Sequence, residues 1–96
     1  MWCVYILYSE KIDRFYVGRT QNIDLRLQYH NNPIESRKYT ARGIPWELRL
    51  TIPCHTKARS ICLEKYIKGA KSRKLIESLI NDTDRVAEIL NRAPDC

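Results

Sequence analysis

The chain has 96 residues, of which 44% are hydrophobic and 29% charged, and its formal net charge is +6. This length suits one domain with a modest core and leaves no room for a second. No apolar run is long enough to span a bilayer, and the first residues lack the basic segment and the long apolar segment of a secretory signal. We therefore expect a cytoplasmic protein with no membrane partner, and no obligate protein partner is readable.

The positive charge is concentrated in the first 80 residues. These carry 15 basic and 7 acidic side chains, a balance of +8, whereas residues 81–96 carry 2 basic and 4 acidic ones, a balance of −2. Lysine and arginine can replace the counterions condensed on phosphates, so the basic part suits a polyanionic partner. Charge alone is equally compatible with a basic protein whose charge serves only solubility.

The N-terminal residues predict a β-hairpin. Residues 2–8 are rich in aromatic and β-branched side chains, and residues 15–18 repeat that composition after a short polar connection. Asn22 is a suitable N-cap for a helix over residues 23–31, with Asp24 in its first turn. The Asn31-Asn32-Pro33 stretch ends this helix, and residues 33–45 read as a polar, basic loop.

A third strand is predicted over residues 47–52. Leu48, Leu50 and Ile52 alternate on one face, and Pro53 ends the segment. Thr56 and Ser72 are suitable caps for two later helices, over residues 57–68 and from residue 73 onward. A last amphipathic turn or two is expected around residues 86–90.

These elements predict an α+β fold, in which a small, three-stranded, mostly antiparallel sheet is flanked by helices in the order β-β-α-β-α-α. We assign residues 1–80 to the domain itself. Residues 81–96 are interpreted as a C-terminal helical extension without an assigned role.

Five side chains form the candidate catalytic set. Tyr5 and Tyr16 lie on the two hairpin strands, and Arg26 and His30 are spaced to share one face of the first helix. Glu64 lies within a helix, and every charged residue that follows it, up to position 74, is basic. Taken singly, each has an ordinary structural explanation: packing for the tyrosines, solvation for Arg26 and His30, and surface ion pairs for Glu64.

Taken in order, these residues resemble a known family, the GIY-YIG nucleases, in its small stand-alone form. Cys3 and Val17 depart from the glycine and isoleucine of the two motifs that name the family, but neither position supplies a functional group. The resemblance runs from about Val4 to Ile80, and it rests on Cys3-Val4-Tyr5, Tyr16-Val17-Gly18, Arg26-x-x-x-His30-Asn31, Lys38-Tyr39-Thr40, Pro45-Trp46, and Glu64-Lys65-Tyr66-Ile67-Lys68 followed by Ser72-Arg73-Lys74.

The resemblance implies an endonuclease that hydrolyses phosphodiester bonds with one divalent metal, Mg²⁺ or Mn²⁺, held by Glu64. A lone carboxylate suits a hard cation that keeps most of its waters. The implied catalytic residues are Tyr5, Tyr16, Arg26, His30 and Glu64, with Arg26 countering charge on the phosphate and Tyr16 positioning a water. Whether Tyr5 or His30 finally accepts the proton of that water is left open.

The implied partner is DNA, recognised through backbone or shape more than through base sequence. Duplex, branched and single-stranded DNA, and also RNA, remain open as targets. A module that binds nucleic acid through the same basic surface without cleaving it is the alternative, but it leaves the ordered catalytic set unexplained. The candidate nucleic-acid contacts are basic side chains of the loop and of the later helices: Arg37, Lys38, Arg42, Lys65, Lys68, Lys71, Arg73 and Lys74.

Overall fold

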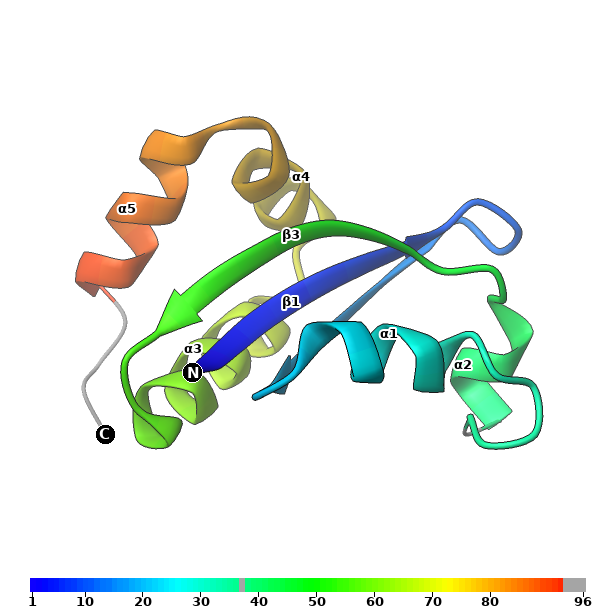
Figure 1. The fold of residues 1–96 in the computed structure, drawn as a ribbon. Helices are drawn as coiled ribbons and strands as arrows, with labels where there is room; N and C mark the ends of the chain where they lie inside the picture. The colour runs from blue at the N-terminus through cyan, green and yellow to red at the C-terminus, as the bar shows by residue number, and fades with distance from the viewer. Residues whose placement is uncertain (37, 93–96) are drawn as a thin grey trace.

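The computed structural model describes residues 1–36 and 38–92, and it is built around one antiparallel sheet (Figure 1). The strand order is β2-β1-β3, so β1 is paired on both sides and β2 is an edge strand. The expected hairpin is confirmed, because β1 and β2 pair in continuous register. The three strands are β1 (Trp2–Ser9), β2 (Arg14–Thr20) and β3 (Glu47–Cys54).

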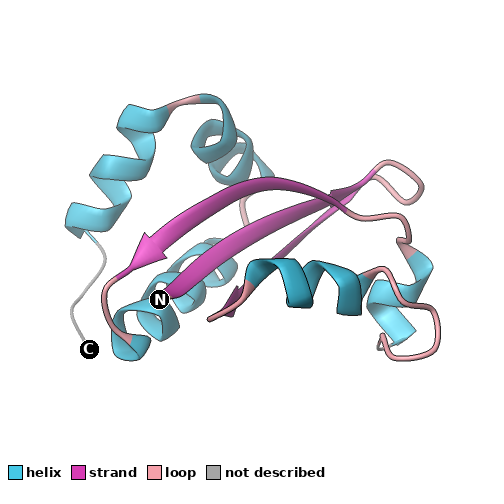
Figure 2. Cartoon of the chain, in the orientation of Figure 1, coloured by secondary structure: helices cyan, strands magenta, loops and turns pink. Residues whose placement is uncertain are grey.

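Helices lie on both sides of this sheet (Figure 2). The caps predicted for three of them are confirmed, because the side chains of Asn22, Thr56 and Ser72 each accept a hydrogen bond from a first-turn backbone amide. The helices are α1 (Ile23–His30), α2 (Lys38–Arg42), α3 (Lys57–Ala70), α4 (Arg73–Asn81) and α5 (Thr83–Arg92). The α+β class is therefore confirmed.

Alternation along β1 sends its side chains into two separate cores. Val4 and Ile6 are fully buried on one face against helices α3, α4 and α5, which contribute Leu63, Ile67, Leu79 and Ile89. Tyr5 and Leu7 are buried on the opposite face with Trp46, and there Ile23 and Leu27 of α1 pack against them. The first core therefore fixes α3, and the second fixes α1.

Three details differ from the sequence expectations. The segment 33–45 is not only a loop, because it contains α2, and Trp46 donates an indole hydrogen bond of 2.6 Å to the Thr40 carbonyl at this helix. Strand β3 continues past Pro53, which is tolerated because β3 is an edge strand. The last amphipathic turns form a full helix, α5, whose Ile89 joins the first core. In the described part of the chain, no helix is both long and apolar enough to cross a membrane.

Candidate active site

Tyr5 and Tyr16 face each other on neighbouring strands. In the β1–β2 ladder Tyr5 lies opposite Gly18, so Tyr16, two residues earlier in β2, lies diagonally across from it on the same face. The ring centroids of the two tyrosines are 6.3 Å apart. Tyr5 is buried and Tyr16 is half-buried, so the hairpin presents one phenol inside the fold and one at its border.

His30, the last residue of α1, reaches the same point from the adjacent layer. Its side chain is buried, and its Nε2 lies 2.8 Å from the Tyr5 hydroxyl. Its ring centroid lies 4.7 Å from that of Tyr16. The other ring nitrogen, Nδ1, is buried and has no hydrogen-bond partner among the described residues. The imidazole therefore has one nitrogen on Tyr5 and one without a protein partner.

The neighbouring Asn31 explains why the end of α1 is held in place. Its Oδ1 accepts a hydrogen bond of 2.6 Å from the Trp46 amide, and its Nδ2 donates one of 3.1 Å to the Trp46 carbonyl. Trp46 is itself buried, and its ring meets Tyr16 edge to face. One amide side chain thus ties the C-terminus of α1 to the start of β3 and fixes the position of His30.

Burial keeps both members of the Tyr5–His30 pair neutral. Burial raises the pKa of the Tyr5 hydroxyl above its ordinary value, and the neighbouring Tyr16 adds to this shift while Arg26 opposes it. Burial, assisted by the positive charge of Arg26, lowers the pKa of His30 to about 4. At neutral pH the pair is a phenol hydrogen-bonded to an uncharged imidazole.

Glu64 approaches from the other side of β2, on helix α3. Its Oε1 lies 3.3 Å from Nε of Arg19, and its Oε2 lies 3.1 Å from Nζ of Lys68. The carboxylate is mostly but not fully buried. Among the described residues, no group of three or more His, Cys, Asp or Glu side chains could hold a metal together. Glu64 is therefore a lone carboxylate with two cationic neighbours.

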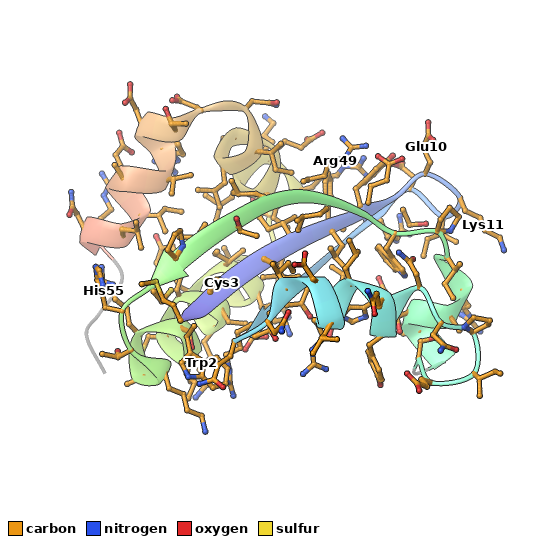
Figure 3. The ribbon with its side chains drawn as sticks, in the orientation of Figure 1. Trp2, Cys3, Glu10, Lys11, Arg49 and His55 are labelled. Atoms are coloured by element: carbon orange, nitrogen blue, oxygen red, sulfur yellow. The ribbon has the colours of Figure 1, made fainter. Side chains whose placement is uncertain are left out.

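The two sides meet in a pocket of about 370 Å³ beside the edge strand β2. Figure 3 shows Trp2 near the start of β1 and close to α3, at the opposite end of the hairpin from Glu10 and Lys11. Because β2 is not covered by a further strand, side chains from both of its faces can border one opening. The pocket is lined by Trp2, Tyr5, Tyr16, Gly18, Arg19, Arg26 and Glu64.

Arg26 brings an exposed positive charge to this pocket. Its guanidinium lies 5.4 Å from the ring centroid of Tyr29, which holds the side chain along α1. His30, four residues later, points inward while Arg26 stays at the surface. Helix α1 therefore carries a surface cation and a buried, neutral imidazole, and both residues border one pocket together with Tyr16.

The family model described as the GIY-YIG catalytic domain matches residues 1–77 of the 96. The chain belongs to the GIY-YIG family. This family consists of nucleases that act on DNA, and the three-stranded antiparallel sheet with flanking helices matches its fold. Comparisons with curated proteins and with solved structures found no significant match.

All five candidate catalytic residues of this GIY-YIG chain come together. Tyr5, Tyr16, Arg26 and Glu64 line the pocket, and His30 contacts it through Tyr5. Sequence reasoning missed Arg19 and Trp2. The period of two along a strand could have found Arg19, since it follows Gly18 and must point to the opposite face from Tyr16, toward α3.

The candidate nucleic-acid contacts are more scattered. Lys65, Lys68, Lys71, Arg73 and Lys74 are all exposed on α3, on α4 or between them, and Arg42 is exposed at the end of α2. Lys68 and Arg73 already pair with carboxylates, those of Glu64 and Asp13 respectively. Arg37 and the side chain of Lys38 lie outside the described part of the structure.

Proposed function

We propose that this protein is a metal-dependent endonuclease that hydrolyses phosphodiester bonds in DNA, with Mg²⁺ as its cofactor and Mn²⁺ as a substitute. One observation carries the proposal. A buried phenol–imidazole hydrogen bond, a lone carboxylate and an exposed arginine converge on one pocket at the edge of β2. A module that only bound nucleic acid would have no use for a buried Tyr5–His30 pair.

The chemistry of the donor set fits a hydrated divalent cation. Glu64 would hold the metal alone, because each carboxylate oxygen that meets Arg19 or Lys68 retains a further lone pair. Mg²⁺ is commonly held in this way, by one or two carboxylates together with waters and substrate phosphates. The chemistry that the cation supplies when bound is polarisation of a phosphoryl oxygen and stabilisation of the leaving oxygen.

Tyr5 and His30 would act as a proton relay and not as a free phenolate base. A phenolate is disfavoured at Tyr5, because burial raises its pKa. As the water attacks phosphorus, Tyr5 accepts a water proton on its oxygen and passes its own hydroxyl proton to Nε2 of His30, 2.8 Å away. Because Tyr5 gains one proton as it loses another, its buried hydroxyl oxygen does not have to carry a full negative charge.

The unpartnered Nδ1 of His30 gives this proton an exit. His30 lines a second pocket of about 370 Å³ with Arg26, Tyr29 and Thr40, and Glu64 does not border this pocket. The low pKa of His30, about 4, favours rapid loss of a proton to water there. The imidazole thereby returns to its neutral state for the next turnover.

Arg26 would counter the extra negative charge on the phosphate as the attacking water bonds to it. Its guanidinium is always charged and can present two donors to two phosphate oxygens. Recognition of DNA would rest on backbone or shape more than on base sequence, through the basic side chains of α3 and α4.

The test is a cleavage assay on a panel of duplex, flap and single-stranded DNA and of RNA, with Mg²⁺ and with EDTA. We expect Mg²⁺-dependent cuts within DNA, and we expect Glu64→Ala to abolish them while the variant still folds and binds DNA. Glu88→Ala is the matched control, since Glu88 is an exposed carboxylate of α5 that pairs with Arg85. Wild-type cleavage by Glu64→Ala would contradict the proposal.

A further inference from the structure

An apolar groove lies directly beside the pocket that Tyr5, Tyr16, Arg26 and Glu64 line, which we call the active pocket. This groove has a volume of about 430 Å³ and lies between β2, α2 and the junction of α3 with α4. Its walls are apolar, with Val17, Ile67 and Ile76 among them, and three aromatic rings border it: Phe15, Tyr16 and Tyr39. Tyr16 belongs to the active pocket as well, so the two hollows share a wall.

Basic side chains border this aromatic groove. Arg14, Lys68, Lys71 and Arg73 line it, and within the described residues no Asp or Glu does. The Lys68 ammonium lies 5.5 Å from the Tyr16 ring centroid, and the Arg73 guanidinium lies 5.1 Å from that of Phe15. Over residues 1–36 and 38–92, neither Arg14 nor Lys71 forms an ion pair with a carboxylate. The border therefore has cations available for phosphates.

We infer that this groove binds an unpaired nucleobase next to the phosphodiester bond that is cut. Aromatic faces beside a line of cations are the chemistry of single-strand recognition, in which bases stack on rings and phosphates meet lysine and arginine. A base inside a duplex keeps both faces stacked on its neighbours, so it cannot use such a groove without leaving the helix. The inference rests on the proposed function, and it names the substrate class: DNA with unpaired nucleotides at the cut.

Tyr39 is the ring best placed to test this inference. It lies on the short helix α2, it is 48% exposed, and its ring centroid is 6.4 Å from that of Tyr16. An exposed ring that contacts Tyr16 offers its free surface to the groove. Because Tyr39 is largely outside the core, its removal should leave the fold intact. Tyr66 is the matched control, as an exposed tyrosine of α3 that does not line the groove.

The experiment measures binding without divalent metal, so that no strand is cut. Probes are single-stranded and flap DNA with one 2-aminopurine among the unpaired bases, and a fully paired duplex with the same analogue. We expect quenched 2-aminopurine fluorescence and tighter binding with the first two probes. Tyr39→Ala should weaken their binding by about 5- to 150-fold, the range for one stacked base, while Tyr39→Phe and Tyr66→Ala stay near wild type.

Equal affinity and equal fluorescence change for paired and unpaired probes would overturn the inference. So would equal losses for Tyr39→Ala and Tyr66→Ala, because the loss would then not come from the groove. The metal-free readout separates this inference from the nuclease proposal. If the protein passes the binding test but cuts no DNA with Mg²⁺, the base-binding inference stands and the nuclease proposal fails. If the protein cuts DNA but fails the binding test, the nuclease proposal stands and the base-binding inference fails.

Discussion

The hydroxyl of Tyr5 occupies the space that a side chain on Gly18 would need. A β-carbon added at Gly18 would lie 2.5 Å from the Tyr5 hydroxyl oxygen and 2.6 Å from the ring carbon that carries it. Tyr5 is buried, and its hydroxyl cannot move aside without disturbing the contact with His30. Gly18→Ala should therefore destabilise the fold by about 1–3 kcal/mol, as overpacking usually does, and should abolish cleavage by displacing the phenol. Chemical denaturation and a cleavage assay measure the two effects.

Gly69→Ala is the control for this substitution. A β-carbon at Gly69, in helix α3, would meet no atom within 4 Å beyond its chain neighbours and the nearby backbone of its own helix. Alanine also has the better helix propensity, so this variant should be as stable as the wild type or more stable by up to about 1 kcal/mol, with normal cleavage. If Gly18→Ala behaved like Gly69→Ala, the close approach of Tyr5 to Gly18 would have no functional meaning.

Tyr5→Phe separates proton transfer from packing. The substitution keeps the ring and deletes the oxygen that meets His30. Loss of a general acid–base group typically costs about 10²- to 10⁴-fold in rate, and we expect a single-turnover loss in that range. Under the proposed function we expect the wild-type rate to rise with pH, with an apparent pKa that belongs to the coupled Tyr5, His30 and metal cluster. This rise should vanish in Tyr5→Phe and move to higher pH in His30→Ala. A nearly normal rate with an unmoved profile would reject Tyr5 as part of the relay.

His30 should make the fold sensitive to mild acid. Its pKa falls from 6.5 to about 4 on folding, so the unfolded chain binds a proton there more readily than the native protein does. This contribution to stability is fully present above pH 6.5 and is lost as the pH falls toward 4, by at most about 3 kcal/mol. His30→Gln should flatten the dependence of unfolding free energy on pH in this window. His55→Gln, at an exposed position, should follow the wild type, and identical curves for all three proteins would exclude the effect.

Arg26 should contribute more to the rate than to affinity. Its side chain lines the active pocket and is not part of the outer basic surface of α3 and α4. Arg26→Ala should lower single-turnover cleavage by about 10²- to 10³-fold with little change in DNA binding. Arg26→Lys should recover little, because a point charge cannot bridge two oxygens. Arg49→Ala, which removes an exposed arginine of β3, controls for net charge. Parallel losses in rate and affinity would make Arg26 an ordinary phosphate anchor.

The basic residues of α3 and α4 should make DNA binding strongly dependent on salt. Lys65 is exposed and pairs with no carboxylate in the described residues, so it can meet a phosphate without first breaking an ion pair. Lys65→Gln should reduce the slope of log affinity against log salt by about one unit. Arg85→Gln, on α5, should leave the slope unchanged. A binding constant independent of salt would reduce these residues to a solvated surface.

Local rules predicted the parts of this fold that local contacts decide. The three caps at Asn22, Thr56 and Ser72 are interactions within four residues of chain, and each helix begins where its cap predicts. Helix α2 could not be predicted in this way. Its five residues are short and basic, and the Trp46 indole that bonds to it arrives from six residues downstream of Thr40. A helix this short is marginal by itself, and the residue pattern does not show that the Trp46 side chain folds back onto it.

Part of the candidate site could also be predicted from the sequence, and part of it could not. The spacing of four predicted that Arg26 and His30 share a side of α1, and the family resemblance supplied Glu64. No local pattern indicated that His30 would be buried with one nitrogen on Tyr5 and the other unpartnered. The pairing of Arg19 with Glu64 likewise joins residues 45 positions apart in different layers. These relationships arise only when the sheet and its two sets of helices assemble.

The two cores on opposite faces of the sheet share no buried residue. One supports α3 and therefore Glu64, and the other supports the Tyr5–His30 pair. Directed evolution could consequently vary the two sets of core residues separately. Under the proposed function, substitutions around Leu63 and Leu79 would adjust how tightly Glu64 holds a metal ion, whereas substitutions around Leu7 and Trp46 would adjust the rate of proton transfer through Tyr5 and His30. Variants improved in one property could then be recombined with variants improved in the other with little epistasis.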